Sequence, residues 1–262
     1  MATNKATEKI NLSGVAKIIV VASGKGGVGK STISAGLAFA LARNGKKVGL
    51  MDADIYGPSI PLLTDTIGFK PLTIEIGGTT PQITTAEKNG VKIQSIGYFI
   101  DDKAAMWRGP MASNTLMQLI EQSAWCRLDY LIIDLPPGTG DIQLSIFQKL
   151  HITGAIIVTT PQTISVTDAS KAAEMISNEA FQIPILGIVE NMSWFSPLSE
   201  PEKKYFLFGS GGGETIAKQY DVPLLAQIPI LMENATENTS NHYIDICHKC
   251  FTPYFNELAS KI

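Results

Sequence analysis

A glycine-rich stretch near the start of the chain has the residue types and spacing of a phosphate-binding loop. Gly24 is followed, after four residues, by Gly29, Lys30 and Ser31. Glycines let backbone N–H groups converge on an anion, a lysine here reaches the β- and γ-phosphates, and a serine hydroxyl can bind Mg²⁺. The alternative is a glycine-rich turn without a ligand. We expect a nucleoside triphosphate and Mg²⁺ to contact the following residues: Gly24, Lys25, Gly26, Gly27, Val28, Gly29, Lys30, Ser31 and Thr32.

Aspartates follow two apolar, strand-like runs, and carboxylates in that position suit a metal–phosphate site. Asp134 ends the run 130–133, where it can hold Mg²⁺ through water, opposite the loop serine. Asp52 and Asp54 end the run 48–51, and alternation along an extended chain aims both side chains to one side. We expect Asp54 to orient the attacking water, and Asp52 is a second candidate for the metal. The alternative for each aspartate is a cap on a turn or helix.

The base of a nucleotide needs contacts of its own. Asn191 closes a predicted strand, and its amide can pair a donor and an acceptor with the edge of adenine. Pro229 follows another apolar run and can form a wall beside the base. For Asn191 the alternative is an Asx turn.

Apolar runs that alternate with helical patterns surround these residues and predict the fold. Strands are expected at 18–22, 48–51, 73–76, 82–85, 91–96, 130–133, 155–158, 185–189 and 224–228, and helices near 33–44, 110–122, 142–149, 165–180 and 214–220. This alternation predicts an α/β fold with a doubly wound, mainly parallel sheet and helices on both faces. Lys88, Asn89 and Gly90 should join 82–85 to 91–96 as a hairpin. We expect one domain from residue 17 to 262, preceded by a flexible arm over 1–16.

Composition excludes several classes of partner. The 262-residue chain is 45% hydrophobic and carries a formal net charge of −3, so a nucleic-acid partner is not expected. It has no apolar run of about 18 residues, so no membrane span is expected. The first residues lack the apolar core of a secretion signal. Three cysteines beside a nucleotide loop fit a reducing compartment, which predicts a cytoplasmic protein.

Lys25 gives the loop a second lysine, just after its first glycine. The run Gly-Lys-Gly-Gly-Val-Gly-Lys-Ser-Thr resembles the deviant Walker A loop of the MinD, nitrogenase iron protein and ParA group of ATPases. In that group the early lysine crosses a dimer interface onto the partner's nucleotide. The resemblance therefore implies a homodimer that sandwiches ATP, with Lys25 and Lys30 both acting in catalysis. The alternative for Lys25 is an exposed lysine that adds only local positive charge.

Further motifs extend the resemblance over residues 15–230. They lie at 22–32, 51–61, 107–111, 129–141, 158–162 and 190–192, and as a set they resemble the Mrp/ApbC/Nbp35 family. The resemblance implies a slow ATPase that carries an iron–sulfur cluster at a dimer interface and passes it to apo-proteins. Apo iron–sulfur proteins or assembly factors are then the implied partners.

The chain departs from that family at the position that would hold the cluster. Family members usually carry Cys-Pro-x-Cys shortly after Glu-Asn-Met, whereas Ser196 and Ser199 stand there in this chain. Serine hydroxyls are poor substitutes for thiolates on iron. Cys247 and Cys250 form a Cys-x-x-Cys pair that can ligate a metal. Their helical spacing with apolar neighbours makes core packing the alternative.

Two functions remain open. The first is an ATPase that carries iron–sulfur clusters or assists their assembly. The second is a nucleotide-gated regulator or scaffold whose ATP-bound dimer presents a surface to a partner and binds no cluster. The serines at 196 and 199 leave the iron–sulfur cluster uncertain as a cofactor.

Overall fold

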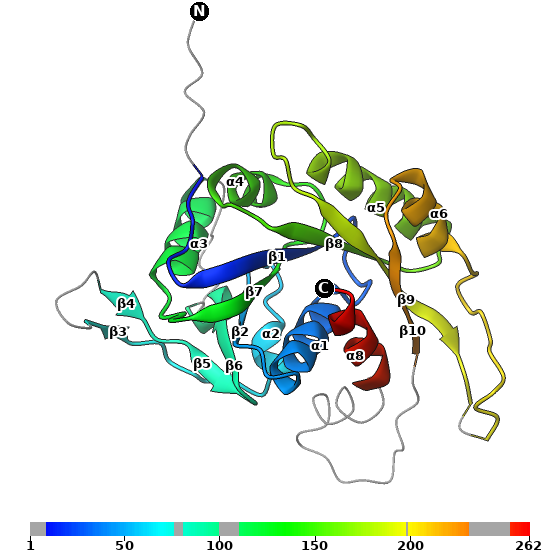
Figure 1. Ribbon diagram of the computed structural model, residues 1–262, viewed down its shortest axis with the longest axis horizontal. Helices are drawn as coiled ribbons and strands as arrows, with labels where there is room; N and C mark the ends of the chain where they lie inside the picture. The colour runs from blue at the N-terminus through cyan, green and yellow to red at the C-terminus, as the bar shows by residue number, and fades with distance from the viewer. Residues whose placement is uncertain (1–8, 76–80, 100–109, 198, 231–251) are drawn as a thin grey trace, which may run out of the picture.

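The computed structural model describes residues 9–75, 81–99, 110–197, 199–230 and 252–262. One sheet is built from β1 (Val15–Ser23), β2 (Val48–Asp52), β5 (Ala86–Lys88), β6 (Val91–Ser95), β7 (Leu128–Asp134), β8 (Gly154–Thr159), β9 (Ile185–Phe195) and β10 (Leu224–Ile230). Its strand order is β10-β9-β8-β1-β7-β2-β6-β5 (Figure 1). All its strands are parallel except the edge strand β5, so the predicted sheet is confirmed.

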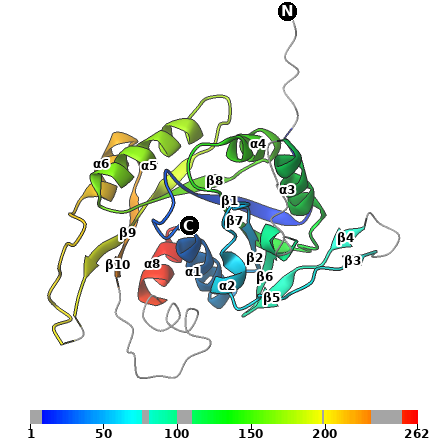
Figure 2. The ribbon, with the colours of Figure 1, turned by 180° about the vertical axis from the view of Figure 1, so that it is seen from behind.

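Helices cover both faces of this sheet, as Figures 1 and 2 show from opposite sides. The helices on one face are α3 (Pro110–Gln122), α4 (Asp141–Lys149), α5 (Thr163–Ile176) and α6 (Gly212–Gln219); those on the other are α1 (Lys30–Arg43), α2 (Ile60–Leu63) and α8 (Thr252–Ser260). The central strand feeds both cores, because Val20 packs on the first side and Val21 on the second. A continuous apolar run therefore suits β1, since both faces of the strand are buried.

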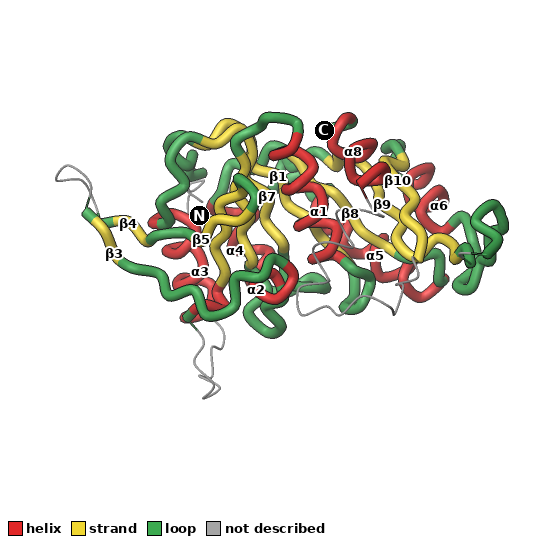
Figure 3. The backbone as a smooth tube through the Cα atoms, turned by 90° about the horizontal axis from the view of Figure 1, so that it is seen from below, coloured by secondary structure: helices red, strands yellow, loops and turns green. Residues whose placement is uncertain are grey.

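The short strands pair differently from the sequence prediction. Strand β4 (Gln82–Ile83) pairs with β3 (Thr73–Ile74) in a separate antiparallel sheet, which projects from one end of the molecule (Figure 3). The hairpin partner of β6 is β5, with Lys88 opposite Val91. Asn89 and Gly90 both have positive φ, 49° and 77°. In such a two-residue turn the residues on either side of it pair with each other. The strand that pairs with β6 therefore ends at Lys88, immediately before the turn.

The last part of the predicted arm is packed against the domain. Leu12 is buried, and the amide of Ile10 donates to the carbonyl of Lys149 at 2.7 Å. Strand β1 begins at Val15, before the predicted domain boundary at residue 17. At the other end of the described chain, Phe255 of α8 packs against Gly36 of α1, where an added β-carbon would lie 2.2 Å from the ring. Among the described residues, no helix has the length and apolar character needed to cross a membrane.

Candidate functional site

The phosphate loop joins β1 directly to α1, which begins at Lys30. Gly27 and Gly29 have positive φ, 81° and 84°, a backbone conformation that residues other than glycine rarely adopt. Gly24 is needed for another reason, because a β-carbon there would lie 2.0 Å from the backbone of Asp168 on α5. The first turn of α1 has no side-chain cap and no acidic residue. Its amide groups and the helix dipole are therefore oriented to receive an anion.

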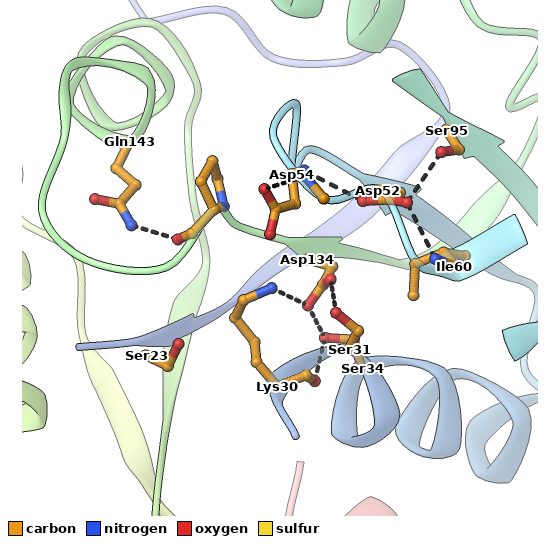
Figure 4. Close-up of polar contacts among 12 residues, drawn as sticks. Ser23, Lys30, Ser31, Ser34, Asp52, Asp54, Ile60, Ser95, Asp134 and Gln143 are labelled. Carbon is orange, nitrogen blue, oxygen red and sulfur yellow. Dashed lines mark hydrogen bonds and ion pairs between the residues drawn. The ribbon is translucent and has the colours of Figure 1, made fainter. Parts of the chain in front are cut away.

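Lys30 and Asp134 meet beneath this loop (Figure 4). Lys30 Nζ lies 2.9 Å from Asp134 Oδ1, and both side chains are buried. The contact is an ion pair without hydrogen-bond alignment, since Nζ has no hydrogen-bond partner within the described chain. The ammonium thus keeps donor capacity beside a cavity that it lines. A buried donor in this state is the group that a polyphosphate would satisfy.

Two serines of α1 complete the surroundings of Asp134. Ser31 Oγ donates to Asp134 Oδ2 at 2.6 Å, and Ser34 Oγ lies 2.7 Å from Asp134 Oδ1. Hydroxyl and carboxylate oxygens are the ligands that Mg²⁺ prefers, so this donor set fits the ion. Ser31 lines the cavity, whereas Asp134 is fully buried behind it. Sequence reasoning missed Ser34, although its position one helical turn after Lys30 places it on the same face of α1.

The predicted strand ends do come together. Strand β7 lies between β1 and β2, and Asp52 pairs in register with Asp134. Asp54 lines the cavity, with its Oδ1 accepting from the amides of Tyr56 and Gly57, each at 3.2 Å. Partial burial raises the pKa of Asp54, Lys30 lowers it, and Asp134 raises it further. Asp54 is therefore a carboxylate at the cavity wall that holds a proton more strongly than an ordinary aspartate.

Asp52 has the capping role that was its alternative. Its Oδ2 accepts from Ser95 Oγ at 2.9 Å and from the amide of Ile60, the first residue of α2, at 3.1 Å. Its Oδ1 accepts from the amide of Asp54 at 3.2 Å. Burial, followed by the charge of Asp134, raises the pKa of Asp52 to about 7. Asp52 does not line the cavity; it fixes the segment that carries Asp54.

No group of three or more potential metal-binding His, Cys, Asp or Glu side chains occurs among the described residues.

The loop after β7 is tied to the phosphate loop and to α4. The amide of Gly138 donates to the carbonyl of Ser23, the last residue of β1, at 2.9 Å. Gln143 Nε2 donates to the carbonyl of Pro136 at 2.6 Å, and its Oε1 accepts from the amide of Gly140 at 2.8 Å. Pro137 also lines the cavity. This loop therefore contacts the site while it is held at both ends.

Lys25 reaches toward α5. Its Nζ lies 3.5 Å from Oε1 of Gln162, the residue just before that helix. The backbone carbonyl of Lys25 accepts from Ser23 Oγ at 3.0 Å. The side chain is half-buried and lines the cavity, so a second cation stands beside the phosphate loop.

Asn191 contacts the loop itself. Its Nδ2 donates to the carbonyl of Val28 at 2.8 Å. Pro229 is buried in β10, next to Ile228, the strand partner of Asn191, and does not line the cavity. The adenine contacts of Asn191 and Pro229 stay predictions.

The cavity has a volume of about 320 Å³ and is lined by Ser23, Lys25, Gly26, Gly27, Val28, Gly29, Lys30, Ser31, Thr32, Asp54, Gly57, Ser59, Leu63 and Pro137.

Ser196 and Ser199 are not among the residues that line this cavity. Ser196 follows β9, whose last residue, Phe195, bridges to Tyr205, and Ser199 is exposed in the connection between them. Cys247 and Cys250 lie outside the described residues. Within the described chain, Cys126 is the free cysteine; it is exposed, with its Sγ 3.4 Å from Lys92 Nζ.

Comparison with known proteins identifies relatives over most of the chain. The model of the ParA family, described as NUBPL iron-transfer P-loop NTPase, matches residues 14–262. The "Iron-sulfur cluster carrier protein" of Escherichia coli K12 is 44% identical over 96% of this chain and 67% of its own length. The proteins of the same name from Pseudomonas fragi and Haemophilus influenzae are 48% and 47% identical, over 89% and 86% of this chain. The chain spans 60% of the length of the Haemophilus protein and 80% of that from Pseudomonas.

Solved structures agree on the fold. The nucleotide-binding protein of Archaeoglobus fulgidus in complex with ADP is 33% identical, with a TM-score of 0.73, over 94% of this chain and 89% of its own. MinD of Pyrococcus horikoshii, with Mg-ADP, is 22% identical, with a TM-score of 0.63, over 94% and 95% of the two chains; this likeness concerns the fold alone.

Proposed function

The chain belongs to the ParA family of NUBPL iron-transfer P-loop NTPases, and we propose that it binds and slowly hydrolyses ATP as a homodimer in order to carry or assemble iron–sulfur clusters. The observation that carries the nucleotide part is the cluster of Lys30, Ser31 and Asp134 under an open phosphate loop. The relatives named iron–sulfur cluster carrier proteins support the second part.

The phosphate loop and the polar side chains beside it have separate roles in this proposal. The loop amides and Lys30 bind the phosphates, while Ser31, with Asp134 behind it, holds Mg²⁺. When bound, Mg²⁺ neutralises charge on the β- and γ-phosphates. Asp54 orients a water molecule and accepts a proton from it. The water oxygen forms a bond to the γ-phosphorus while the bond from that phosphorus to the β–γ bridging oxygen breaks, leaving ADP and phosphate. Asp54 is suited to this because it reaches the cavity wall and its pKa is raised.

Dimerisation supplies the remaining cation. In the proposed dimer Lys25 leaves its neighbour Gln162 and contacts the partner's nucleotide. The long separation between Lys25 Nζ and Gln162 Oε1, 3.5 Å, is consistent with a contact that is readily exchanged. Turnover is then slow, because catalysis waits for assembly of the dimer.

A second function is favoured by one observation. Ser196 and Ser199 offer hydroxyls where the resemblance implies thiolates, so that position does not fit an iron–sulfur cluster. A cluster carried as cargo then needs other sulfur donors, and Cys247 with Cys250 is the proposed pair. Without it, the chain acts as a nucleotide-gated regulator that binds no cluster.

Anaerobic reconstitution separates the two functions. The wild type, Cys247→Ser/Cys250→Ser and the control Cys126→Ser are incubated with iron and sulfide, desalted, and analysed for both elements. A carrier retains iron and sulfide in the wild type and in the control, and loses them in the double variant. Retention in all three proteins would contradict the proposed ligand pair. No retention in the wild type would leave the regulator as the function.

A further inference from the structure

We propose that Asn191 is a positioning residue for the phosphate loop, and that it acts through the Val28 carbonyl rather than by reading the base. The inference deepens the proposed function and rests on its nucleotide site. Asn191 Nδ2 donates to Val28 O at 2.8 Å, and the side chain is 8% exposed. Asn191 comes from β9, which is separated from β1 by β8. The contact therefore joins the loop to a strand outside its own strand–loop–helix unit.

The contact controls the direction of a phosphate-binding donor. In a trans peptide the C=O and the following N–H lie in one plane and point in opposite directions. Because Asn191 holds the Val28 carbonyl on its own side, the amide of Gly29 is directed the other way. Val28 and Gly29 both line the cavity, and phosphate loops bind anions through converging amides of this kind. Asn191 thus fixes the orientation of a group that touches phosphate.

Gly29 is shaped to admit this side chain. A β-carbon on Gly29 would lie 2.2 Å from Asn191 Nδ2, and the residue also has a φ of 84°. Glycine is therefore needed here both for the backbone conformation and for the close approach of the amide. If Asn191 contacted only the base of a nucleotide, its side chain would not require a glycine at position 29.

The two neighbours of Asn191 in β9 hold its backbone in place: Glu190 forms side-chain hydrogen bonds, and Met192 has an unusual backbone conformation. Glu190 Oε2 accepts from the amide of Gly213 at 2.7 Å, and its Oε1 accepts from Gln227 Nε2 at 2.9 Å. Met192 has a φ of 56°, which is unusual for a residue other than glycine. Such a conformation persists where the surroundings determine it, and it is common at functional positions. Asn191 is therefore presented to the loop by a rigid support.

The two roles differ in the ligands they affect. A base reader contributes nothing to a ligand without a base, whereas a loop-positioning residue contributes to any polyphosphate. Inorganic tripolyphosphate therefore separates them. The variant Asn191→Leu keeps the shape of the side chain but removes its donor and acceptor. Ser193→Ala is the matched control, because Ser193 is buried in the same strand and its Oγ donates to the carbonyl of Glu190 rather than to the loop.

Dissociation constants are measured for ATP, GTP and tripolyphosphate, each with Mg²⁺, on the full chain. We expect Asn191→Leu to weaken all three by a similar factor, roughly three- to tenfold for one buried hydrogen bond, with the ATP to GTP ratio unchanged. Ser193→Ala should bind all three like the wild type. Unchanged tripolyphosphate binding, together with a lost preference for ATP, would overturn the proposal in favour of base reading.

Hydrogen exchange without any ligand tests the same contact independently of the proposed function. Amides of residues 24–29 should exchange several-fold faster in Asn191→Leu than in the wild type, and exchange at wild-type rates would overturn the proposal. A wild type that bound no nucleotide would remove the proposed function, while the exchange result would still decide the role of Asn191 in the loop. If Asn191→Leu loses its native circular dichroism spectrum, Asn191→Ala replaces it.

Discussion

Lys30 and Asp134 lie against each other beneath the phosphate loop, with 2.9 Å between Nζ and Oδ1. Their side chains are 6% and 0% exposed, so each charge depends on the other for compensation. The same ammonium is the cation that the loop presents to a polyphosphate, because Lys30 also lines the cavity. Stability of the empty protein and affinity for nucleotide are therefore coupled through one side chain.

Replacing Lys30 by methionine should affect both properties. We expect at least a tenfold loss of ATP affinity and, because Asp134 is left buried without its counter-ion, a loss of about 3 kcal/mol in the free energy of unfolding. Calorimetric titration and urea unfolding measure the two effects. Lys171→Met is the control, since Lys171 forms an exposed ion pair with Asp168 and should change stability by less than about 1 kcal/mol. ATP binding at wild-type affinity in Lys30→Met would refute the phosphate-loop assignment.

Asp54→Asn should separate hydrolysis from binding. The amide keeps the shape of the side chain but cannot accept a proton, so we expect kcat to fall by about a hundredfold while ATP affinity stays within about threefold. In the wild type, burial raises the pKa of Asp54, so kcat should increase as pH rises through that raised value. Steady-state phosphate release measures kcat and its dependence on pH. Asp65→Asn, at an exposed aspartate paired with Lys88, serves as control. Undiminished turnover in Asp54→Asn would remove this residue from the mechanism.

Asp52 should make stability depend on pH. Its pKa is about 7 in the folded protein, against 3.8 for an ordinary aspartate, so the folded state binds the extra proton between these two pH values. The free energy of unfolding should therefore fall as pH rises from 5 to 8, and the loss should be complete above the folded pKa. The free energy of unfolding is measured by urea unfolding with a chelator and no nucleotide. Its decrease between pH 5 and 8 should be about 1–3 kcal/mol smaller in Asp52→Asn than in the wild type. Ser95→Ala keeps the carboxyl and should retain it. Identical pH profiles for the wild type and Asp52→Asn would contradict the assignment.

The parts of this site that follow from local sequence were predictable. The spacing of Gly24, Lys30 and Ser31 defines the loop within one stretch of chain, and Asp134 ends an apolar run that was readily identified as a strand. The structure brings Lys30, Ser31 and Asp134 into contact because β1 and β7 are neighbours in the sheet. Sequence alone does not state that order, but the rule that ligands bind at strand carboxyl ends was sufficient here.

Contacts between distant elements were not predictable in the same way. The bond from Asn191 to Val28 joins residues 163 positions apart, and only the assembled sheet places them together. The cap formed by Asp52 depends on where α2 begins, which is set by tertiary packing rather than by a local signal. The partner of the Asn89–Gly90 turn was misassigned because the predicted strand 82–85 ended before the turn, whereas the residues that flank a two-residue turn are the ones that pair.

Lys25→Ala tests the proposed dimer. If Lys25 reaches the partner's nucleotide, its loss should abolish ATP-dependent dimerisation while each subunit still binds ATP through Lys30. Light scattering after size exclusion, with and without ATP and Mg²⁺, measures the mass of the species. Gln162→Ala is an informative companion, because it frees Lys25 from its neighbour at 3.5 Å and should leave dimerisation intact. ATP-dependent dimers of Lys25→Ala would exclude a trans role for this lysine.

Restoring sulfur ligands tests what the serines at 196 and 199 mean. Ser199 is exposed and Ser196 half-buried in the connection after β9, so cysteine should fit at both positions without repacking a core. Thiolates bind iron far better than hydroxyls, so Ser196→Cys/Ser199→Cys should retain more iron and sulfide after anaerobic reconstitution than the wild type. Iron and sulfide analysis and the visible absorption of the cluster provide the measurement.

The control for this experiment places the same pair elsewhere. Ser170→Cys/Ser177→Cys adds two thiols on and just after α5 and should retain no more iron than the wild type, because a ligand pair must also be close in space. If the variant at 196 and 199 gains no iron, the connection after β9 is not a cluster site even with the family's ligands. If it gains iron that ATP then releases, the nucleotide cavity and this connection are coupled through β9, the strand that carries Asn191 against the loop.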